Sequence, residues 1–163
     1  MGYFVDTTNS NAVLPSDKME EAYQRLVDLN KRDDLKSGGA FGPEGKTDVW
    51  FSWMPADYPS QCSTVEEILK AVGYDTHMDT EGNLTVYSYS NKTGCEDVFI
   101  WAIADLFEEG SYLEWQGEER EQYRWDFGGG KPMTTSSAVI QWVYNGEFEP
   151  FDYKSFNASL RRP

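Results

Sequence analysis

Two groups of residues in this chain of 163 have types and spacings that could support chemistry at a phosphate or a metal ion. The first is Gly45-Lys46-Thr47, which matches the end of a phosphate-binding loop, where backbone amides cradle phosphates and the lysine reaches their oxygens. That loop also needs a glycine at position 40, where this chain has Ala40, and a helix after the lysine, where Val49-Trp50-Phe51 predicts a strand. We therefore expect that removing Lys46 leaves any activity intact.

The second group is Asp75, His77 and Asp79, which alternate and would share one face of a strand, as the ligands of a metal ion do. His77 is the only histidine, so a site with two histidine ligands is excluded. Alternation alone also places these three side chains on the solvent face of a half-buried hairpin, which is the interpretation we favour. We expect no metal, no cofactor and no catalytic residue.

Cys62 and Cys95 are the only cysteines, too few for a disulfide framework or a four-cysteine zinc site. We expect both to be buried free thiols. The beginning of the chain has no basic segment followed by an apolar one, and no stretch approaches the roughly 18 apolar residues of a membrane helix. We therefore expect a cytoplasmic protein that does not enter a membrane.

Charge gives the strongest constraint on partners. Twenty-eight acidic residues against 14 basic ones leave a formal charge of −14, which repels nucleic acids and anionic lipids and attracts basic protein surfaces. Ten of the acids, and only Arg120 and Arg124 to oppose them, lie between Glu96 and Asp126. Two interpretations remain open: the acids recognise a basic partner, or they only keep the protein soluble.

The acidic band coincides with a predicted hairpin. Leu113 and Trp115 alternate with their neighbours and should face the core, while Gly117 to Glu119 should form the turn. We expect exposed carboxylates at the outer face and turn of this hairpin, and they are our first candidates for partner binding: Glu114, Glu118, Glu119 and Glu121.

A second candidate surface is the segment 53–59, which contains two prolines, two aromatic residues and an acid. Such a segment is semi-rigid and can anchor a partner, or it can merely cover the edge of a core. Its candidate contact residues are Trp53, Asp57 and Tyr58.

Helices are predicted where apolar residues recur at helical spacing after a capping residue. The expected capping residues are Ser16 for the first helix, Ser63 or Thr64 for the second and Thr93 for the third. The expected terminating glycines of the second and third helices are Gly73 and Gly110. The third helix has the widest apolar face, which includes Ile103, so we expect it to be the central helix of the core.

Strands are predicted where apolar residues alternate: near 3–5, 49–53, 74–78, 84–89, 113–115, 123–127 and 138–144. The resulting order, βαβαββαβββ, predicts an α+β fold with about three helices on one side of a mostly antiparallel sheet. We expect a single domain over 1–163, with a mobile loop at 31–46 and an irregular tail after 146. Tryptophans at apolar periodic positions should lie in the core: Trp50, Trp101, Trp115, Trp125 and Trp142.

Residues 1–5, MGYFV, and residues 123–131, YRWDFGGGK, resemble small uncharacterised acidic proteins of bacteriophages and actinobacterial mobile elements. That group has no established catalytic residues to carry over. The resemblance implies a setting in which small acidic phage proteins occupy basic surfaces of host nucleic-acid-handling or defence proteins, sometimes as mimics of DNA.

The sequence thus favours a non-enzymatic interaction protein of phage type that inhibits or modulates a basic host protein without binding nucleic acid directly. Two alternatives stay open. One is a small ligand-binding or metal-binding enzyme domain that uses the Asp75, His77, Asp79 face or the glycine-rich loop. The other is a structural or assembly component of a virion.

Overall fold

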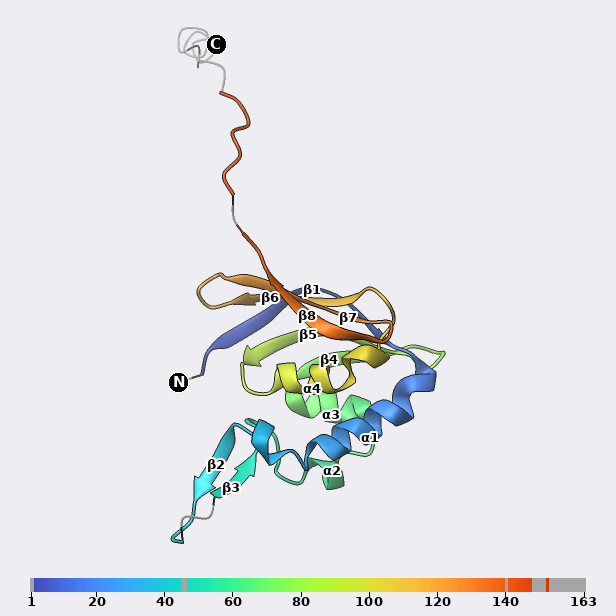
Figure 1. The fold of residues 1–163 in the computed structure, drawn as a ribbon. Helices are drawn as coiled ribbons and strands as arrows, with labels where there is room; N and C mark the ends of the chain where they lie inside the picture. Colours follow the sequence, from blue (N-terminus) through green and yellow to red (C-terminus); the bar gives the residue numbers. More distant parts are fainter. Residues whose placement is uncertain (1, 45–46, 140, 148–151, 153–163) are drawn as a thin grey trace, which may run out of the picture.

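The computed structural model describes residues 2–44, 47–139, 141–147 and 152. Its main feature is a six-stranded antiparallel sheet with the strand order β4-β5-β1-β6-β7-β8. A separate two-stranded sheet is made by β2 and β3 (Figure 1). The strands are β1 Phe4–Leu14, β2 Gly38–Phe41, β3 Thr47–Trp50, β4 Tyr74–Met78, β5 Leu84–Lys92, β6 Ser111–Gly117, β7 Gln122–Gly128 and β8 Lys131–Ser137.

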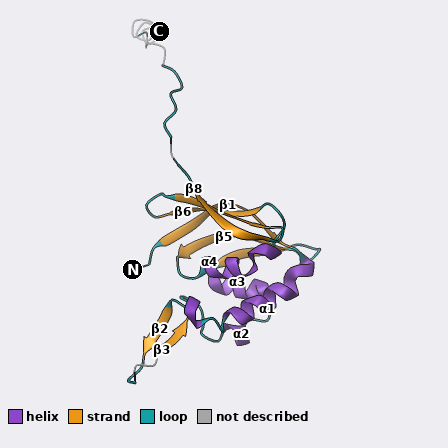
Figure 2. Ribbon diagram, viewed as in Figure 1, coloured by secondary structure: helices purple, strands orange, loops and turns teal. Residues whose placement is uncertain are grey.

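Three longer helices cover one face of the large sheet and leave the other face open (Figure 2). These are α1 Met19–Leu29, α3 Val65–Val72 and α4 Glu96–Ile103, and a single helical turn, α2 Tyr58–Gln61, precedes α3. Short 3₁₀ turns are Ser16–Lys18, Asp33–Leu35 and Ala104–Leu106. The predicted α+β class and the mostly antiparallel sheet are confirmed.

The core lies between the helices and the covered face of the sheet. As predicted, α4 is buried deeply: Phe99, Ile100 and Ile103 have no exposed surface. From the sheet, Leu113 and Trp115 of β6 are equally buried, which confirms the alternation expected there. Burial on one face only is what an antiparallel sheet with helices on one side requires.

The predicted start of α3 is confirmed, with Thr64 and not Ser63 as the capping residue. The Thr64 hydroxyl accepts a hydrogen bond of 3.1 Å from the Glu67 amide, and the Glu67 carboxylate accepts one of 2.6 Å from the Ser63 amide. Gly73 ends the helix in the left-handed conformation, with φ of 118°. Reciprocal hydrogen bonds of this kind satisfy amides that the first turn of a helix leaves unpaired.

Three other expected helix ends are wrong. Thr93 does not cap α4, because the N-cap position is Cys95 and the Thr93 hydroxyl bonds to the Glu96 side chain instead of a backbone amide. Ser16 does not cap α1, because it lies in a 3₁₀ turn and its own amide donates to the Asn83 side chain. Gly110 does not end the third helix, because α4 stops at Ile103 and continues only as a short 3₁₀ turn. Its φ of 81° instead serves the turn that leads into β6.

The first strand is longer than predicted. The polar residues 7–11 resemble a loop in sequence, but they lie inside β1, which pairs with β5 on one side and β6 on the other. Because the outer face of the sheet carries no helices, a central strand here tolerates polar side chains on that face. The pairing is irregular in this part, with register shifts between Asp6 and Ala12.

The expected loop at 31–46 contains the β2 strand, which pairs with β3 from Gly38 opposite Trp50 to Phe41 opposite Thr47. Lys46, which belongs to the phosphate-loop match, lies outside the described residues. The strand expected over 49–53 instead ends at Trp50. The chain then turns, and the Met54 amide donates to the Phe51 carbonyl at 3.0 Å.

The last strand also differs from the prediction. β8 begins at Lys131, directly after the glycine turn, and pairs with β7 up to Ser137 opposite Tyr123. β7 is then paired with β8 over nearly its whole length, so the expected strand 138–144 has no further strand to pair with. Residues 138, 139 and 141–147 form no strand, and Ile140 lies outside the described residues.

Of the five tryptophans predicted to lie in the core, two are buried and three are not. Trp115 and Trp125 are core residues, as predicted, with 0% and 7% of their surface exposed. Trp50 is only half-buried. Trp101 is 51% exposed and Trp142 95% exposed, so both were wrongly assigned to the core.

Candidate partner-binding surface

The turn between β6 and β7 holds three of the four predicted carboxylates. It is closed by two hydrogen bonds, from the Arg120 amide to the Gly117 carbonyl at 2.9 Å and from the Gly117 amide to the Glu121 carbonyl at 3.0 Å. The side chains of Glu118, Glu119 and Glu121 are exposed, as expected. Arg120 has a φ of 67°, a left-handed conformation that favours glycine in turns of this kind.

Tyr3, just before β1, and Phe4, its first residue, hold this acidic turn in place. The Tyr3 hydroxyl donates to the Glu121 carboxylate and accepts a hydrogen bond of 3.3 Å from the Glu119 amide. The Glu118 carboxylate accepts one of 2.9 Å from the Phe4 amide. The hydrogen bond with Glu121 raises the pKa of the Tyr3 phenol above its ordinary value. The turn is therefore positioned by the N-terminal strand.

Trp53 projects from a second loop. Its neighbours Phe51 and Met54 are buried, at 1% and 5% exposure, whereas Trp53 is 59% exposed. Its φ of 67° is unusual for so large a residue. Its indole Nε1 donates weakly to the Thr93 carbonyl at 3.4 Å, and a Cβ added at Gly94 would lie 2.6 Å from the indole ring. The ring is held against Gly94, where any larger residue would displace it.

Lys92 connects the two loops. Its Nζ lies 5.6 Å from the centre of the Trp53 ring and 5.8 Å from the centre of the Phe4 ring, both within the range of a cation–π interaction. Phe4 is itself 43% exposed. A continuous set of contacts thus links Trp53 to the acidic turn. We call this set the aromatic–acidic surface: Phe4, Trp53, Lys92, Glu118, Glu119 and Glu121.

The surface combines two exposed aromatic rings with an acidic border. Arg120 and Lys92 offset part of the charge of its three carboxylates, so most of the acidic field comes from the whole chain, with its net charge of −14. Exposed aromatic residues are frequent anchors of protein interfaces, and charges at the border guide the encounter. Among the described non-glycine residues, positive φ occurs only at Trp53 and Arg120, so both strained positions lie in the two loops that form this surface.

The sequence located Trp53 and the acidic turn but did not predict that they meet. Phe4 and Lys92, which connect them, were not among the candidates. One signal could have identified Phe4: in an alternating strand Phe4 and Val5 face opposite sides, so one of them must be exposed. For Lys92 we find no comparable signal.

Three predicted contact residues lie elsewhere. Tyr58 is fully buried, because its ring packs 5.4 Å from that of Phe99 and its hydroxyl donates to the Leu26 carbonyl at 2.6 Å. This overturns its expected surface position. Asp57 is exposed, and its carboxylate accepts hydrogen bonds from Ser60 and Gln61 in its own turn.

Glu114 points to the open face, as expected, but it is half-buried and paired with Arg124 at 3.0 Å. The same guanidinium pairs with Asp126 at 2.9 Å and lies 3.8 Å from the centre of the Tyr112 ring. Hydrogen bonding to Asp126 is the main cause that raises the pKa of Arg124. Glu114 therefore belongs to an ion-pair network centred on Arg124 on the sheet and not to the acidic turn.

The residues considered for metal binding do not form a cluster. Asp75 and His77 are exposed on β4, and Asp75 accepts a hydrogen bond of 2.6 Å from Ser88. The Asp79 carboxylate accepts hydrogen bonds from the Asn83 side chain and from the amides of Glu81 and Asn83, which lowers its pKa. Within the described part of the chain, no three His, Cys, Asp or Glu side chains are grouped to hold a metal ion.

Both cysteines are free thiols. Cys95 is buried, as predicted, and burial raises the pKa of its thiol to about 12, so it is protonated and unreactive at neutral pH. Cys62 is only partly buried, with its pKa raised by the same effect.

Comparison of the chain with family models, curated proteins and solved structures finds no match in any of the three. Over the residues that the structure describes, no helix is long and apolar enough to cross a membrane.

Proposed function

We propose that this chain is a non-enzymatic interaction protein that binds a basic protein through its aromatic–acidic surface. The exposed ring of Trp53 carries the proposal, because it is fixed by Gly94, Lys92 and the Thr93 carbonyl at 59% exposure instead of being packed inside. A large aromatic side chain held rigidly at the surface loses little conformational freedom on binding, which favours its use as an anchor.

The acidic turn and the overall charge are the second support for this proposal. With a formal charge of −14, the chain attracts basic surfaces over distances set by ionic strength. Glu118, Glu119 and Glu121 then meet basic groups around the aromatic anchor. Together with the resemblance to phage proteins, this supports a role as an inhibitor or modulator of a basic host protein of nucleic-acid metabolism or defence, in the manner of a DNA mimic.

The proposal is tested by affinity capture from a bacterial lysate at low and high salt, with the wild-type chain and Trp53→Ala immobilised in parallel. We expect a basic protein to be retained by the wild type at low salt and released at high salt. Trp53→Ala should retain at least about tenfold less of it, as expected for an interface anchor.

A matched control is Tyr87→Ala, which removes another exposed aromatic side chain, 50% exposed, from β5. It should retain the same protein as well as the wild type does. Equal retention by Trp53→Ala and wild type would contradict the proposal, and so would equal losses in the two variants.

A further inference from the structure

The strand β8 forms one end of the large sheet, with β7 as its only neighbour there. A strand at the end of a sheet presents unpaired amides and carbonyls to which another strand can add. Natural edge strands are protected by charged residues and prolines, and β8 has these only at its start, Lys131 and Pro132. The remaining residues of β8 are uncharged.

The segment that follows β8 is apolar and exposed. It leaves the sheet as an extended chain (Figure 1). The exposed fractions are 88% for Val139, 95% for Trp142, 68% for Val143 and 78% for Tyr144. Side chains of this kind normally have a partner, because large exposed apolar patches mark interaction sites.

We propose that residues 132–144 pair with the same residues of a second copy of this chain, as antiparallel strands about a two-fold axis. The stretch is centred on Ala138, with six residues of β8, 132–137, before it and six residues, 139–144, after it. Each copy then covers the free edge of the other and joins two six-stranded sheets into one. Such isologous pairing is the commonest form of dimer symmetry.

The symmetry fixes the parity of the register. The two-fold axis runs perpendicular to the sheet, so side chains on one face of the first copy lie on the same face in the second. Because successive residues of a strand point to opposite faces, an odd-numbered residue must lie opposite an odd-numbered one, and an even-numbered residue opposite an even-numbered one. With Ala138 on the axis, Val143 of one copy lies opposite Met133 of the other. In the same register Trp142 lies opposite Thr134.

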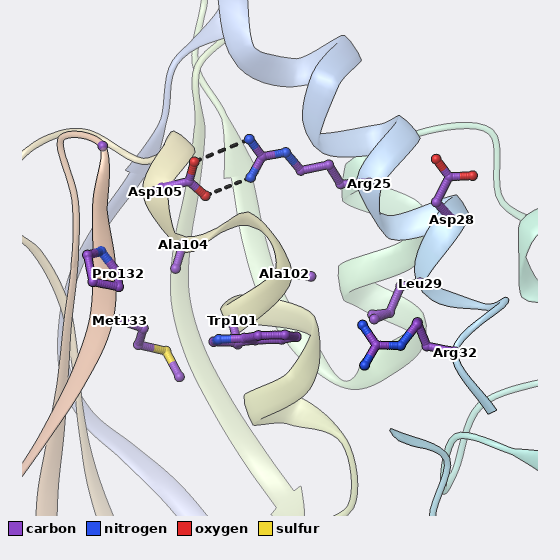
Figure 3. A pocket seen from close by; sticks show the side chains of 11 residues that line it. Arg25, Asp28, Leu29, Arg32, Trp101, Ala102, Ala104, Asp105, Pro132 and Met133 are labelled. Carbon is purple, nitrogen blue, oxygen red and sulfur yellow. Dashed lines mark hydrogen bonds and ion pairs between the residues drawn. The ribbon is translucent and has the colours of Figure 1, made fainter. Parts of the chain in front are cut away.

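Both faces of the β8 edge have hollows that this register would cover. On the helical face, Trp101, Pro132 and Met133 line an open groove of about 650 Å³ (Figure 3). Trp101, on α4, is exposed in this groove. A second hollow of about 360 Å³ has Asp126, Phe127 and Thr134 among its lining residues. Val143 would approach the groove and Trp142 the second hollow.

Charge favours a second copy at this edge. Residues 1–130 contain 25 acids and 10 bases, because 3 of the 28 acids and 4 of the 14 bases lie beyond them. Two such bodies repel each other. Between Asp126 and Glu147 the chain has no acid at all, so residues 132–144 are where two copies can approach with least repulsion. This interface uses none of the residues of the aromatic–acidic surface.

The test is the mass of the full chain in solution over a range of concentrations, measured by sedimentation equilibrium. We expect a dimer of the 18.6 kDa chain. Trp142→Glu should raise the dissociation constant by about tenfold or more, as expected for loss of an aromatic anchor. Gln141→Glu adds the same charge at the adjacent position and should raise it far less. Both residues are exposed within one chain, so the melting temperature of the monomer should not change.

The register is tested separately with Ala138→Cys. Opposed residues in an antiparallel pair have Cα atoms about 4.5–5.5 Å apart, which suits a disulfide. Mild oxidation should therefore link two copies through position 138, and Tyr144→Cys should not form such a link. A monomer at all concentrations, or a dimer indifferent to Trp142→Glu, would overturn the proposal. A dimer that Ala138→Cys cannot cross-link would overturn the register.

Discussion

The strands and the turn of the β6–β7 hairpin adjoin in sequence but differ in what they do. In the strands, Leu113, Trp115 and Trp125 are buried, and the Trp115 ring lies 4.6 Å from that of Trp125 and 5.6 Å from that of Tyr89. In the turn, carboxylates are exposed around a left-handed Arg120. The strands serve the core, whereas nothing in the core requires an acidic turn.

This difference separates residues that stabilise the core from the exposed carboxylates that we propose for recognition. Changes in the strands should unfold the protein, because they open cavities among close-packed rings. Changes in the turn should leave the fold and alter only the surface.

The largest effect is expected from Trp115→Ala. Trp115 has no exposed surface, so the truncation should lower the free energy of unfolding by about 3–5 kcal/mol. Trp115→Phe should cost clearly less, because it keeps a ring and also removes an indole Nε1 that is buried without a hydrogen-bond partner. Chemical denaturation measures both. A loss below about 1 kcal/mol for Trp115→Ala would show that these strands do not contribute to the core.

A smaller effect of opposite sign is expected from Arg120→Gly. Glycine adopts the φ of 67° without the clash that a Cβ causes, so the variant should gain about 1 kcal/mol in stability. Arg120→Ala is the control, because it also removes the charge but keeps the Cβ, and it should gain nothing. Thermal unfolding of both variants decides whether the turn is strained.

A smaller effect still is expected for Glu119→Lys. Its side chain is exposed, and exposed substitutions usually stay within about ±0.5 kcal/mol. Glu118 and Glu121 also contact Phe4 and Tyr3, so their reversal should cost slightly more than that of Glu119. Denaturation of the three single variants gives this ranking, and a loss of several kcal/mol for Glu119→Lys would show that the turn is needed for folding.

The contact between Tyr3 and the turn should make the stability of the fold depend on pH. Because its hydrogen bond with Glu121 raises its pKa in the folded state, the bond stabilises the fold below the unfolded pKa of about 10. This contribution is lost as pH rises through the folded pKa. The difference in stability between wild type and Tyr3→Phe should therefore shrink above pH of about 10. A difference that grows with pH would contradict the contact.

The sequence predicted those parts of the fold that depend on local signals. The boundaries of α3 follow from Thr64 and Gly73, and the burial of Trp115 follows from alternation. The assignments that failed depend on which strands are available for pairing. Residues 7–11 lie in a strand because β5 and β6 flank them. Residues 138, 139 and 141–144 form no strand, because β7 is already paired with residues up to Ser137.

The candidate surface was predictable in its parts and not in its assembly. Trp53 was distinguished by its proline-rich segment, and the acidic turn by alternation around Gly117. Their connection runs through Phe4 and Lys92, which come from strands distant in sequence. Only the register of β1 between β5 and β6 brings these residues together.

The most direct test of the aromatic–acidic surface is the rate at which the captured basic partner associates with two matched variants at low salt. One variant reverses the turn: Glu118→Lys, Glu119→Lys, Glu121→Lys. The other reverses three exposed acids elsewhere and changes the net charge equally: Glu44→Lys, Glu81→Lys, Glu108→Lys. We predict that the turn variant associates about tenfold or more slowly and that the control variant stays much closer to the wild type, because charges near an interface steer encounter most strongly. Equal rates for the two variants would contradict the assignment of the aromatic–acidic surface.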